Sequence, residues 1–243
     1  MENISIQKIK WIKSLQLKKN RENEGLFVVE GKKIILELIT TYPQSIKLIA
    51  GKIDLVESID DLDSSIIFSA KSEELERMTS LNSAPTILAV VSKIEMQPID
   101  FSKRILILDG IQDPGNLGTI IRTADWFGIH QIVCSENTVD LYNYKTLQAT
   151  MGSFLRVSVH YSNLIDFISE TQLPIYGALM NGTNITETDF NSIKVLILGN
   201  EGKGISQEVI ELITNPITIK GYGGAESLNV GVAAGILMYN WAN

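Results

Sequence analysis

The C-terminal part of this 243-residue chain contains a series of short apolar runs, each followed by a segment with helical periodicity. Unbroken runs of Val, Ile and Leu separated by helices are typical of a parallel sheet that is covered on both faces. We predict strands at 105–108, 131–134, 156–160, 175–179, 194–198 and 216–219, and helices at 117–127, 145–151, 164–170, 207–212 and 228–241. The fold class is therefore α/β, and ligands are expected at the carboxyl ends of the strands.

A polar stretch, SKIEMQPIDFSKR at 92–104, separates this region from the N-terminal part of the chain. Because it contains Pro98 and is polar throughout, we interpret it as a linker. We predict an N-terminal domain at 1–97 and a C-terminal domain at 98–243. The first of these is expected to be a small α/β unit, with helices at 6–16, 32–40 and 72–78 and strands at 26–29, 46–50, 66–68 and 87–91.

The charge of the chain is unevenly distributed. A net charge of −7 taken alone argues against a nucleic-acid partner. Residues 1–33, however, carry eight Lys or Arg against four Glu, a local balance of +4, whereas residues 101–243 have a balance of −5. The basic segment could bind a phosphate backbone, or its lysines could simply be the solvated faces of amphipathic helices.

The composition also indicates the cellular compartment in which the protein is expected. A single cysteine, Cys134, excludes an intramolecular disulfide framework and indicates a reducing compartment. The N-terminal sequence lacks the apolar core of a signal peptide, and no run reaches the roughly 18 apolar residues that cross a bilayer. We expect a cytoplasmic protein without a membrane partner. His130 and His160 are isolated in the sequence, so no metal site is predicted.

The first of three polar clusters, QDPGNLGTIIRTADWFG at 112–128, follows the apolar run at 105–108. Asn116 is expected to cap a helix whose apolar face excludes Arg122. Arg122 could form an exposed pair with Asp125 at i,i+3, which would contribute a few tenths of a kcal/mol. Alternatively, Arg122 is held there to bind a negatively charged ligand.

The second and third clusters are rich in glycine. LILGNEGKGIS at 196–206 has glycines that expose backbone groups, but its spacing does not match a phosphate-binding P-loop. IKGYGGAESLNVGVAAGILMYN at 219–240 leads from another glycine loop into a helix with small residues, which favour close packing. No dinucleotide fingerprint follows the first strand. A cofactor site is therefore expected in the C-terminal third of the chain.

In order and spacing, the three clusters resemble the SpoU/TrmH family of RNA ribose 2′-O-methyltransferases, in the SPOUT superfamily. The resemblance rests on Asn116 with Arg122-Thr123, on the loop Leu198–Gly204 and on Ser227–Val230, SLNV. It covers most of residues 104–243. The N-terminal stretch EGLFVVEGKKIILELI, at 24–39, is similar to the ribosomal-protein-like substrate-binding domain of rRNA-modifying members.

The resemblance implies a SPOUT domain with a C-terminal trefoil knot, a homodimer formed through that domain, S-adenosylmethionine as the cofactor without a metal, and RNA as the partner, with rRNA favoured over tRNA. The residues implied in catalysis are Arg122, Asn116, Glu201, Ser227 and Asn229. Those implied in cofactor binding are Ala178, Leu179, Met180, Leu198, Gly199, Asn200, Gly202, Ile219 and Leu228. The basic residues expected to bind RNA are Lys18, Lys19, Arg21, Lys32, Lys33 and Arg156.

Two positions depart from the family pattern. Lys220-Gly221 stand where Pro-Met is usual, which puts the shape of the adenine pocket in question, and Gly231 replaces the usual Ser or Ala. A guanidinium is a poor base because its pKa exceeds about 12. We therefore expect Arg122 to bind a phosphate and stabilise the developing alkoxide, while the phosphate or a water accepts the proton.

Three alternatives stay open. The chain could methylate tRNA ribose, or it could be a non-catalytic RNA-binding or ribosome-assembly protein with the same fold. The five polar residues of the clusters argue against the second of these, because a protein that only binds RNA has no need of all of them. A nicotinamide-dependent enzyme is disfavoured by the missing fingerprint.

Overall fold

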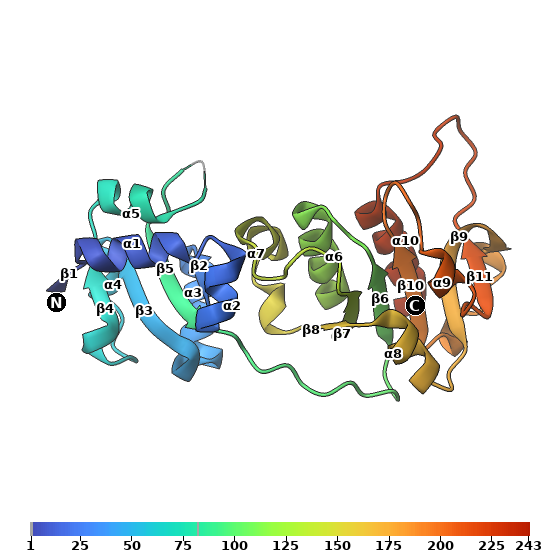
Figure 1. The fold of residues 1–243 in the computed structure, drawn as a ribbon, viewed down its shortest axis with the longest axis horizontal. Coiled ribbons are helices and arrows are strands. Elements are labelled where there is room, and N and C mark those ends of the chain that lie inside the picture. The colour runs from blue at the N-terminus through green and yellow to red at the C-terminus, as the bar shows by residue number, and fades with distance from the viewer. Residues whose placement is uncertain (1, 82) are drawn as a thin grey trace. The chain divides into compact units, whose positions relative to one another are not determined.

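The computed structural model describes residues 2–81 and 83–243, which form two compact units (Figure 1). The first unit contains the described residues up to Glu95 together with Tyr142–Gln148. The second contains Met96–Leu141 and Ala149–Asn243. The sequence pattern suggested a division near residue 97, and nothing in it indicated that 142–148 would group with the N-terminal part.

The first unit is built on a five-stranded mixed sheet in the order β1-β4-β3-β5-β2. Strand β5 runs antiparallel to both of its neighbours, while β1, β3 and β4 are mutually parallel. Its strands are β1 (Glu2–Asn3), β2 (Leu26–Glu30), β3 (Ile46–Gly51), β4 (Ile67–Ser69) and β5 (Ile87–Ser92). Its helices are α1 (Ile6–Ser14), α2 (Lys18–Glu24), α3 (Lys32–Thr41), α4 (Ile53–Val56) and α5 (Ser72–Met78).

Helix α2 was not expected from the sequence, because KKNRENE has no apolar periodicity. It is held by Arg21, whose side chain is only 5% exposed. The guanidinium Nη1 donates hydrogen bonds to the carbonyl oxygens of Leu15 (3.1 Å) and Gln16 (2.6 Å), just after α1 ends. Arg21 therefore satisfies carbonyls that a helix end leaves unpaired. Its place in the interior removes it from the predicted set of RNA-binding side chains.

The second unit is a six-stranded sheet in the order β11-β9-β10-β6-β7-β8, and every neighbouring pair in it is parallel. The predicted α/β class and parallel sheet are confirmed. Its strands are β6 (Ile105–Asp109), β7 (Gln131–Ser135), β8 (Ser158–Ser162), β9 (Ile175–Asn184), β10 (Val195–Gly199) and β11 (Asn215–Thr218). Its helices are α6 (Pro114–Trp126), α8 (Leu164–Glu170), α9 (Gln207–Ile210) and α10 (Val230–Ala242), and α7 (Tyr144–Thr150) begins within the first unit.

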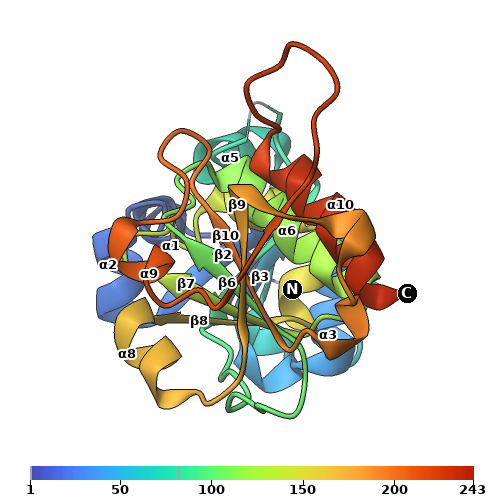
Figure 2. The same cartoon turned by 90° about the vertical axis from the view of Figure 1, so that its right-hand side faces the viewer.

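The central strands are buried on both faces, as their sequences require. Every residue of β6 is buried, and the side chains of β10 from Val195 to Leu198 are buried as well. Helices α6 and α10 pack side by side against the sheet (Figure 2). The chain order reverses between β6 and β10, so the loops after these two strands lead in opposite directions. Crevices at such switch points are the usual ligand sites of open α/β sheets.

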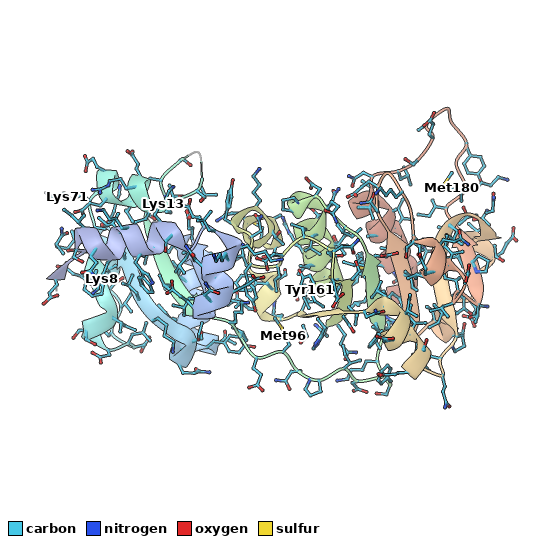
Figure 3. The ribbon with its side chains drawn as sticks, viewed as in Figure 1. Lys8, Lys13, Lys71, Met96, Tyr161 and Met180 are labelled. Carbon is cyan, nitrogen blue, oxygen red and sulfur yellow. The ribbon has the colours of Figure 1, made fainter. Side chains whose placement is uncertain are left out.

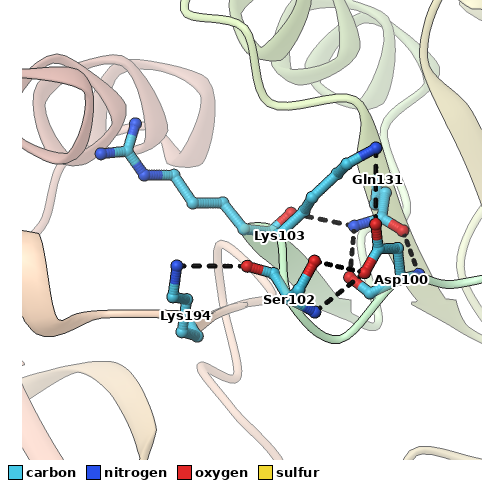
Figure 4. Close-up of polar contacts among 6 residues, drawn as sticks. Asp100, Ser102, Lys103, Gln131 and Lys194 are labelled. Atoms are coloured by element: carbon cyan, nitrogen blue, oxygen red, sulfur yellow. Dashed lines mark hydrogen bonds and ion pairs between the residues drawn. The ribbon is translucent and has the colours of Figure 1, made fainter.

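The chain entering β6 is fixed by a polar network at the amino end of the strands (Figure 4). Gln131 exchanges two hydrogen bonds with the backbone of Asp100: the Asp100 N–H donates to its Oε1 (2.6 Å) and its Nε2 donates to the Asp100 oxygen (3.1 Å). Lys194 donates to the carbonyl of Ser102 (3.2 Å). Hydrogen bonds from Ser102 hold the pKa of the Asp100 carboxyl below its ordinary value. The network anchors β6, β7 and β10 at the edge opposite the predicted ligand sites.

Candidate active site

Helix α6 begins one turn earlier than its sequence suggested. Its N-cap is Asp113, whose side chain accepts a hydrogen bond from the Asn116 N–H (2.8 Å), and Pro114 occupies the first turn. The expectation that Asn116 caps this helix is therefore wrong. Proline is favoured at the first helical position because its missing N–H costs nothing there. The side chain of Asn116 is consequently free to bond outside its own helix.

Asn116 connects the other two clusters. Its Nδ2 donates to Glu201 Oε1 (2.5 Å), from the loop after β10. Its Oδ1 accepts from Asn229 Nδ2 (3.0 Å), at the start of α10. These partners lie 85 and 113 residues away along the chain. Three of the five predicted catalytic residues thus form one hydrogen-bonded chain, which we call the Asn116 link (Glu201, Asn116 and Asn229).

The far end of the Asn116 link determines where α10 starts. Asn229 is the N-cap of α10, and its Oδ1 accepts from the N–H groups of Gly231 (2.9 Å) and Val232 (3.3 Å). A Cβ added to Gly231 would lie 3.1 Å from Asn229 Oδ1 and 3.4 Å from Thr119 Cγ2. Gly231, where the family pattern usually has Ser or Ala, therefore lies in a narrow space between the cap of α10 and helix α6.

Arg122 lies two turns further along α6, with its side chain exposed. The alternative pair with Asp125 does not form. Instead, Asp125 accepts a bidentate contact from Arg156, with Nη2 to Oδ2 at 2.7 Å and Nε to Oδ2 at 2.9 Å. Burial raises the pKa of Asp125, but the hydrogen bonds from Arg156 and Ser153 outweigh it and leave that pKa below its ordinary value. Arg122 forms no hydrogen bond or ion pair with any residue that the structure describes.

Several backbone N–H groups of the loop after β10 form hydrogen bonds within the loop itself. The N–H groups of Asn200 and Gly204 bond to each other's carbonyl oxygens (2.9 Å each). Asn200 Oδ1 accepts from the N–H groups of Gly202 (2.9 Å) and Lys203 (3.1 Å). The loop therefore does not offer these donors to a phosphate, which agrees with its failure to match a P-loop. Leu198 is buried, so only its backbone can contact a ligand.

Gly199 is required by a close approach of the chain to itself. A Cβ at this position would lie 2.2 Å from the carbonyl carbon of Gly204 and from the nitrogen of Ile205. What the geometry shows is that the sharp return of the loop depends on the absence of a side chain.

Apolar side chains are exposed on β9, just after β11 and in the segment before α10. Met180, on β9, is 74% exposed (Figure 3), and Leu228, before α10, is 46% exposed. Ala178, Leu179 and Ile219 are partly exposed. Thr218 donates to the carbonyl of Met180 (3.2 Å), which joins the two strands at this point. These residues, predicted to contact a cofactor, are thus available to cover an apolar group.

The segment 220–229 that leads into α10 projects away from the sheet (Figures 1 and 2) and is exposed throughout. Ser227 lies within it and forms no hydrogen bond with a described residue. The structure therefore does not bring Ser227 into the Asn116 link. Lys220-Gly221 stand in the same segment, and a Cβ added to Gly221 would meet no heavy atom within 4 Å beyond its chain neighbours.

A cavity of about 440 Å³ opens beside the Asn116 link, between the loops that follow β6, β7 and β10. Five of the eight residues that line it belong to the first two polar clusters of the sequence: Gln112, Asn200, Lys203, Gly204 and Ser206. Asp109, Gly110 and Asn137 lie outside those clusters. The polar side chains that line it are those of Asp109, Gln112, Asn137, Asn200, Lys203 and Ser206.

The first unit carries the other predicted RNA contacts. Lys18, Lys19, Lys32 and Lys33 are exposed, and Lys18 pairs at i,i+4 with Glu22 (3.6 Å). Next to them along the chain, Glu30 is buried and accepts from the Thr79 hydroxyl (2.5 Å). Burial raises the pKa of Glu30, although hydrogen bonds from Thr79 and Ser80 oppose the shift. This bond fixes residue 79 beside the turn that presents Lys32 and Lys33.

The described parts of the chain contain no group of three or more His, Cys, Asp or Glu side chains that could hold a metal ion. Within residues 2–81 and 83–243, none of the helices has the length and apolar character that crossing a membrane requires. Cys134, on β7, is a buried free thiol whose pKa is raised by burial.

Comparisons with known proteins agree with this geometry. Residues 103–239 match the SpoU rRNA Methylase family, and residues 7–89 match the MRM3-like substrate binding domain. The 23S rRNA (guanosine(2553)-2′-O)-methyltransferase RlmP of Bacillus subtilis is 34% identical over 99% of this chain and 98% of its own length.

Two solved structures extend the comparison. A protein of Porphyromonas gingivalis, described as a TrmH-family RNA methyltransferase, superimposes with a TM-score of 0.89 at 32% identity, covering 98% of both chains. An rRNA methyltransferase from Sinorhizobium meliloti, bound to AdoMet, has a TM-score of 0.85 at 24% identity, covering 99% of this chain and 96% of its own. At 24% identity, the comparison with the Sinorhizobium meliloti protein shows a similarity of fold.

The Asn116 link predicts energetic coupling between its members. Asn116→Ala removes both bonds, whereas Asn229→Ser keeps a side chain able to cap α10 and loses the donor to Asn116. In chemical unfolding, the double variant should lose less stability than the two single variants combined, with a coupling free energy of about 0.5–3 kcal/mol. Asn163→Ser, which alters the N-cap of α8, should show no coupling to Asn116→Ala. If the stability losses of Asn116→Ala and Asn229→Ser were fully additive, the result would contradict the Asn116 link.

The close approach at Gly199 predicts a contrast between two glycines of one loop. Gly199→Ala should lower the free energy of unfolding by about 1–3 kcal/mol, because its Cβ overlaps backbone atoms that cannot easily move. Gly202→Ala should change it by less than about 0.5 kcal/mol, because the nearest atom, Asn200 Oδ1, lies 3.7 Å from the added Cβ. Thermal and chemical unfolding measure both. Equal stability of the two variants would show that the loop is not packed as described.

Proposed function

The chain belongs to the SpoU rRNA methylase family and is an RNA ribose 2′-O-methyltransferase; we propose that it methylates ribosomal RNA with S-adenosylmethionine as the methyl donor. The observation that carries the proposal is the Asn116 link, which joins three polar residues from distant segments beside an exposed Arg122. An arrangement of this kind can hold three segments of the chain in the fixed relation that positioning a substrate requires.

The residues expected to hold the cofactor fit its chemistry. Exposed Met180 and Leu228 can cover an adenine ring, and the loop after β10 binds its own N–H groups rather than an anion. When bound, S-adenosylmethionine supplies an electrophilic methyl group on a positively charged sulfur. Leu198, Gly199, Asn200 and Gly202 would contact it mainly through backbone atoms, and Ala178, Leu179 and Ile219 would complete the wall.

Arg122 is proposed to hold the RNA at the reacting ribose. A guanidinium binds a phosphate through two parallel hydrogen bonds, and Arg122 has no described partner that would compete. The same charge stabilises the alkoxide that develops at the 2′-oxygen. The ribose proton leaves to the neighbouring phosphate or to a water, because the guanidinium keeps its own protons at neutral pH.

Asn116 and Glu201 act as positioning residues. The Glu201 carboxylate accepts from Asn116, which fixes the loop after β10 relative to the helix that carries Arg122. Asn229 connects the start of α10 to these two segments through its hydrogen bond to Asn116. Productive methyl transfer requires the attacking and attacked atoms to lie within about 3–3.5 Å in line, so a fixed relation between these segments matters. Ser227 is proposed to contact the nucleotide from the segment 220–229.

Ribosomal RNA is favoured over tRNA by the N-terminal unit. Residues 7–89 match the MRM3-like substrate binding domain, and RlmP, which is similar over nearly the whole chain, acts on 23S rRNA by its name. Lys18, Lys19, Lys32 and Lys33 supply exposed positive charge in that unit, and phosphate contacts of this kind dominate affinity for RNA. Arg156 is proposed as a weaker contact because Asp125 already neutralises it.

A homodimer through the second unit is also proposed. Helices α6 and α10, which pack together, expose the large apolar side chains of Trp126 (84%), Val232 (53%) and Tyr239 (60%). Exposed apolar side chains of this size, aromatic ones above all, are typical of interaction surfaces. The trefoil knot implied by the resemblance is part of the same proposal, and tracing the chain in a crystal structure would test it.

Methyl transfer is the direct test of the proposed function. Labelled methyl groups from S-adenosylmethionine should enter the rRNA pool of cells that lack this gene, and not the tRNA pool. Arg122→Ala should lower the rate by at least about 10²-fold, as expected for loss of a transition-state charge contact. Arg77→Ala, a change in the other unit outside the proposed site, is the matched control and should retain activity. Incorporation into tRNA alone would overturn the substrate, and none into either pool would favour an RNA-binding protein without activity.

The role of Arg122 predicts a particular pH dependence. Because a guanidinium is a poor base and Arg122 is proposed to act through its charge, the single-turnover rate should be independent of pH between about 6 and 10. The comparison of wild type with Arg122→Ala at each pH gives the measurement. A rate that rises tenfold per pH unit in the wild type and loses that slope in the variant would identify Arg122 as the base.

The proposed dimer predicts a concentration-dependent mass. Trp126→Lys should convert the protein to a monomer in sedimentation equilibrium, because a charge replaces an anchor in the apolar patch. Phe101→Lys, which also removes an exposed aromatic, should leave the dimer intact. A monomeric wild-type protein at micromolar concentration would exclude the dimer.

A further inference from the structure

The cavity beside the Asn116 link lies at the switch point of the sheet, where the loops after β6 and β10 diverge. Its volume of about 440 Å³ is within the range of small-ligand pockets. Asn200 Nδ2 donates to the carbonyl of Gly110 (2.7 Å), so the two loops are joined at its base. None of the predicted cofactor residues except Asn200 lines it, which leaves its function unassigned.

Several polar groups of this cavity are not used by the fold. Asp109 is only 7% exposed, and its Oδ2 accepts from the N–H and the hydroxyl of Ser206 (2.7 Å each). Its Oδ1 accepts no hydrogen bond from a described residue. The side chains of Asn137 and Lys203 form none either, within residues 2–81 and 83–243. The cavity thus presents a fixed acceptor, an amide and an ammonium group.

These groups match one nucleobase better than the others. Guanine presents two adjacent donors, N1–H and the N2 amino group, next to the acceptor O6. Asp109 Oδ1 and the Asn137 carbonyl oxygen can accept the two donors, and Lys203 can donate to O6. Adenine and cytosine each offer a single exocyclic amino donor beside an acceptor, and uracil offers one donor between two acceptors. A buried acceptor left unpaired is costly, so those bases would be disfavoured.

The cavity adjoins the Asn116 link through the loops that follow β6 and β10. Glu201 directly follows Asn200, which lines the cavity, and Glu201 is held by Asn116. Gln112 lines it from the loop that leads into α6, and its Nε2 donates to the carbonyl of Asn137. Enzymes that modify RNA commonly read an unstacked base by its Watson–Crick edge.

We propose, on the basis of the function proposed above, that this cavity binds the base of the target nucleotide and that the base is guanine. Asp109 is the main determinant of specificity, with Asn137 and Lys203 in support. The name of RlmP, which specifies a guanosine, is consistent with this choice.

The test compares bases at the methylated position. Once that position is mapped in rRNA, RNA fragments carrying guanosine, inosine or adenosine there are methylated under kcat/KM conditions. The wild-type protein should prefer guanosine to inosine, which lacks the N2 amino group, by about 5-fold to 150-fold, the equivalent of 1–3 kcal/mol. Asp109→Asn presents an N–H₂ where Oδ1 stood and can still accept from Ser206, so it should reduce this preference to within about threefold.

Two further variants keep the proposal falsifiable if Asp109→Asn fails to fold. Asn137→Ala and Lys203→Ala alter exposed side chains and should each weaken the preference, whereas Glu136→Gln, a neighbouring exposed residue outside the lining, should not. Affinity for S-adenosylhomocysteine, measured by calorimetry, should stay unchanged in all four.

Three results would overturn the assignment: a mapped target that is not guanosine, a guanosine preference that survives all three cavity variants, or a loss of S-adenosylhomocysteine affinity in them, which would make the cavity part of the cofactor site. Each of these is distinct from failure of the proposed function, which would show as no methyl transfer to RNA by the wild-type protein.

Discussion

The arrangement of the second unit depends on one side-chain amide. Asn116 donates through Nδ2 to Glu201 and accepts through Oδ1 from Asn229, so each half of the amide serves a different segment. A carboxylate could not replace it because a carboxylate has no hydrogen-bond donor. An alkyl group could not replace it because it neither donates nor accepts hydrogen bonds. Through this group, the first turn of α6, the loop after β10 and the N-cap of α10 are held at fixed positions relative to one another.

The surroundings of the Asn116 link show how the chain keeps its reactive groups available. Asp113 takes over the capping of α6 and so frees Asn116, and Arg156 occupies Asp125 and so leaves Arg122 without a partner among the described residues. In each case a second residue makes the structural contact that the functional side chain would otherwise make. Asp109 follows the same pattern, because Ser206 uses only one of its two carboxylate oxygens.

Much of this fold could be predicted from the sequence, because parallel strands buried on both faces leave continuous apolar runs that local patterns reveal. The three polar clusters were also visible, since they follow strands. Their contacts were not, because bonds such as that between Asn116 and Asn229 join residues 113 positions apart. The burial of Arg21 and the helix α2 were missed for the same reason: a charged segment without periodicity becomes ordered only through tertiary contacts. The cavity at Asp109 combines residues of two of these clusters with the loop after β7, and no local pattern shows that the three loops meet.

If the Asn116 link positions the reacting groups, its loss should affect the chemical step more than the binding of either ligand. The most direct measurement is the single-turnover rate of methyl transfer by Asn116→Ala with S-adenosylmethionine and rRNA both saturating. A misplacement of about 1 Å costs roughly 10²-fold in rate, so the rate should fall by about that factor while S-adenosylhomocysteine affinity changes by less than about threefold. A rate equal to that of the wild-type protein, in a variant that is folded and saturated, would show that the link serves only to hold the fold together.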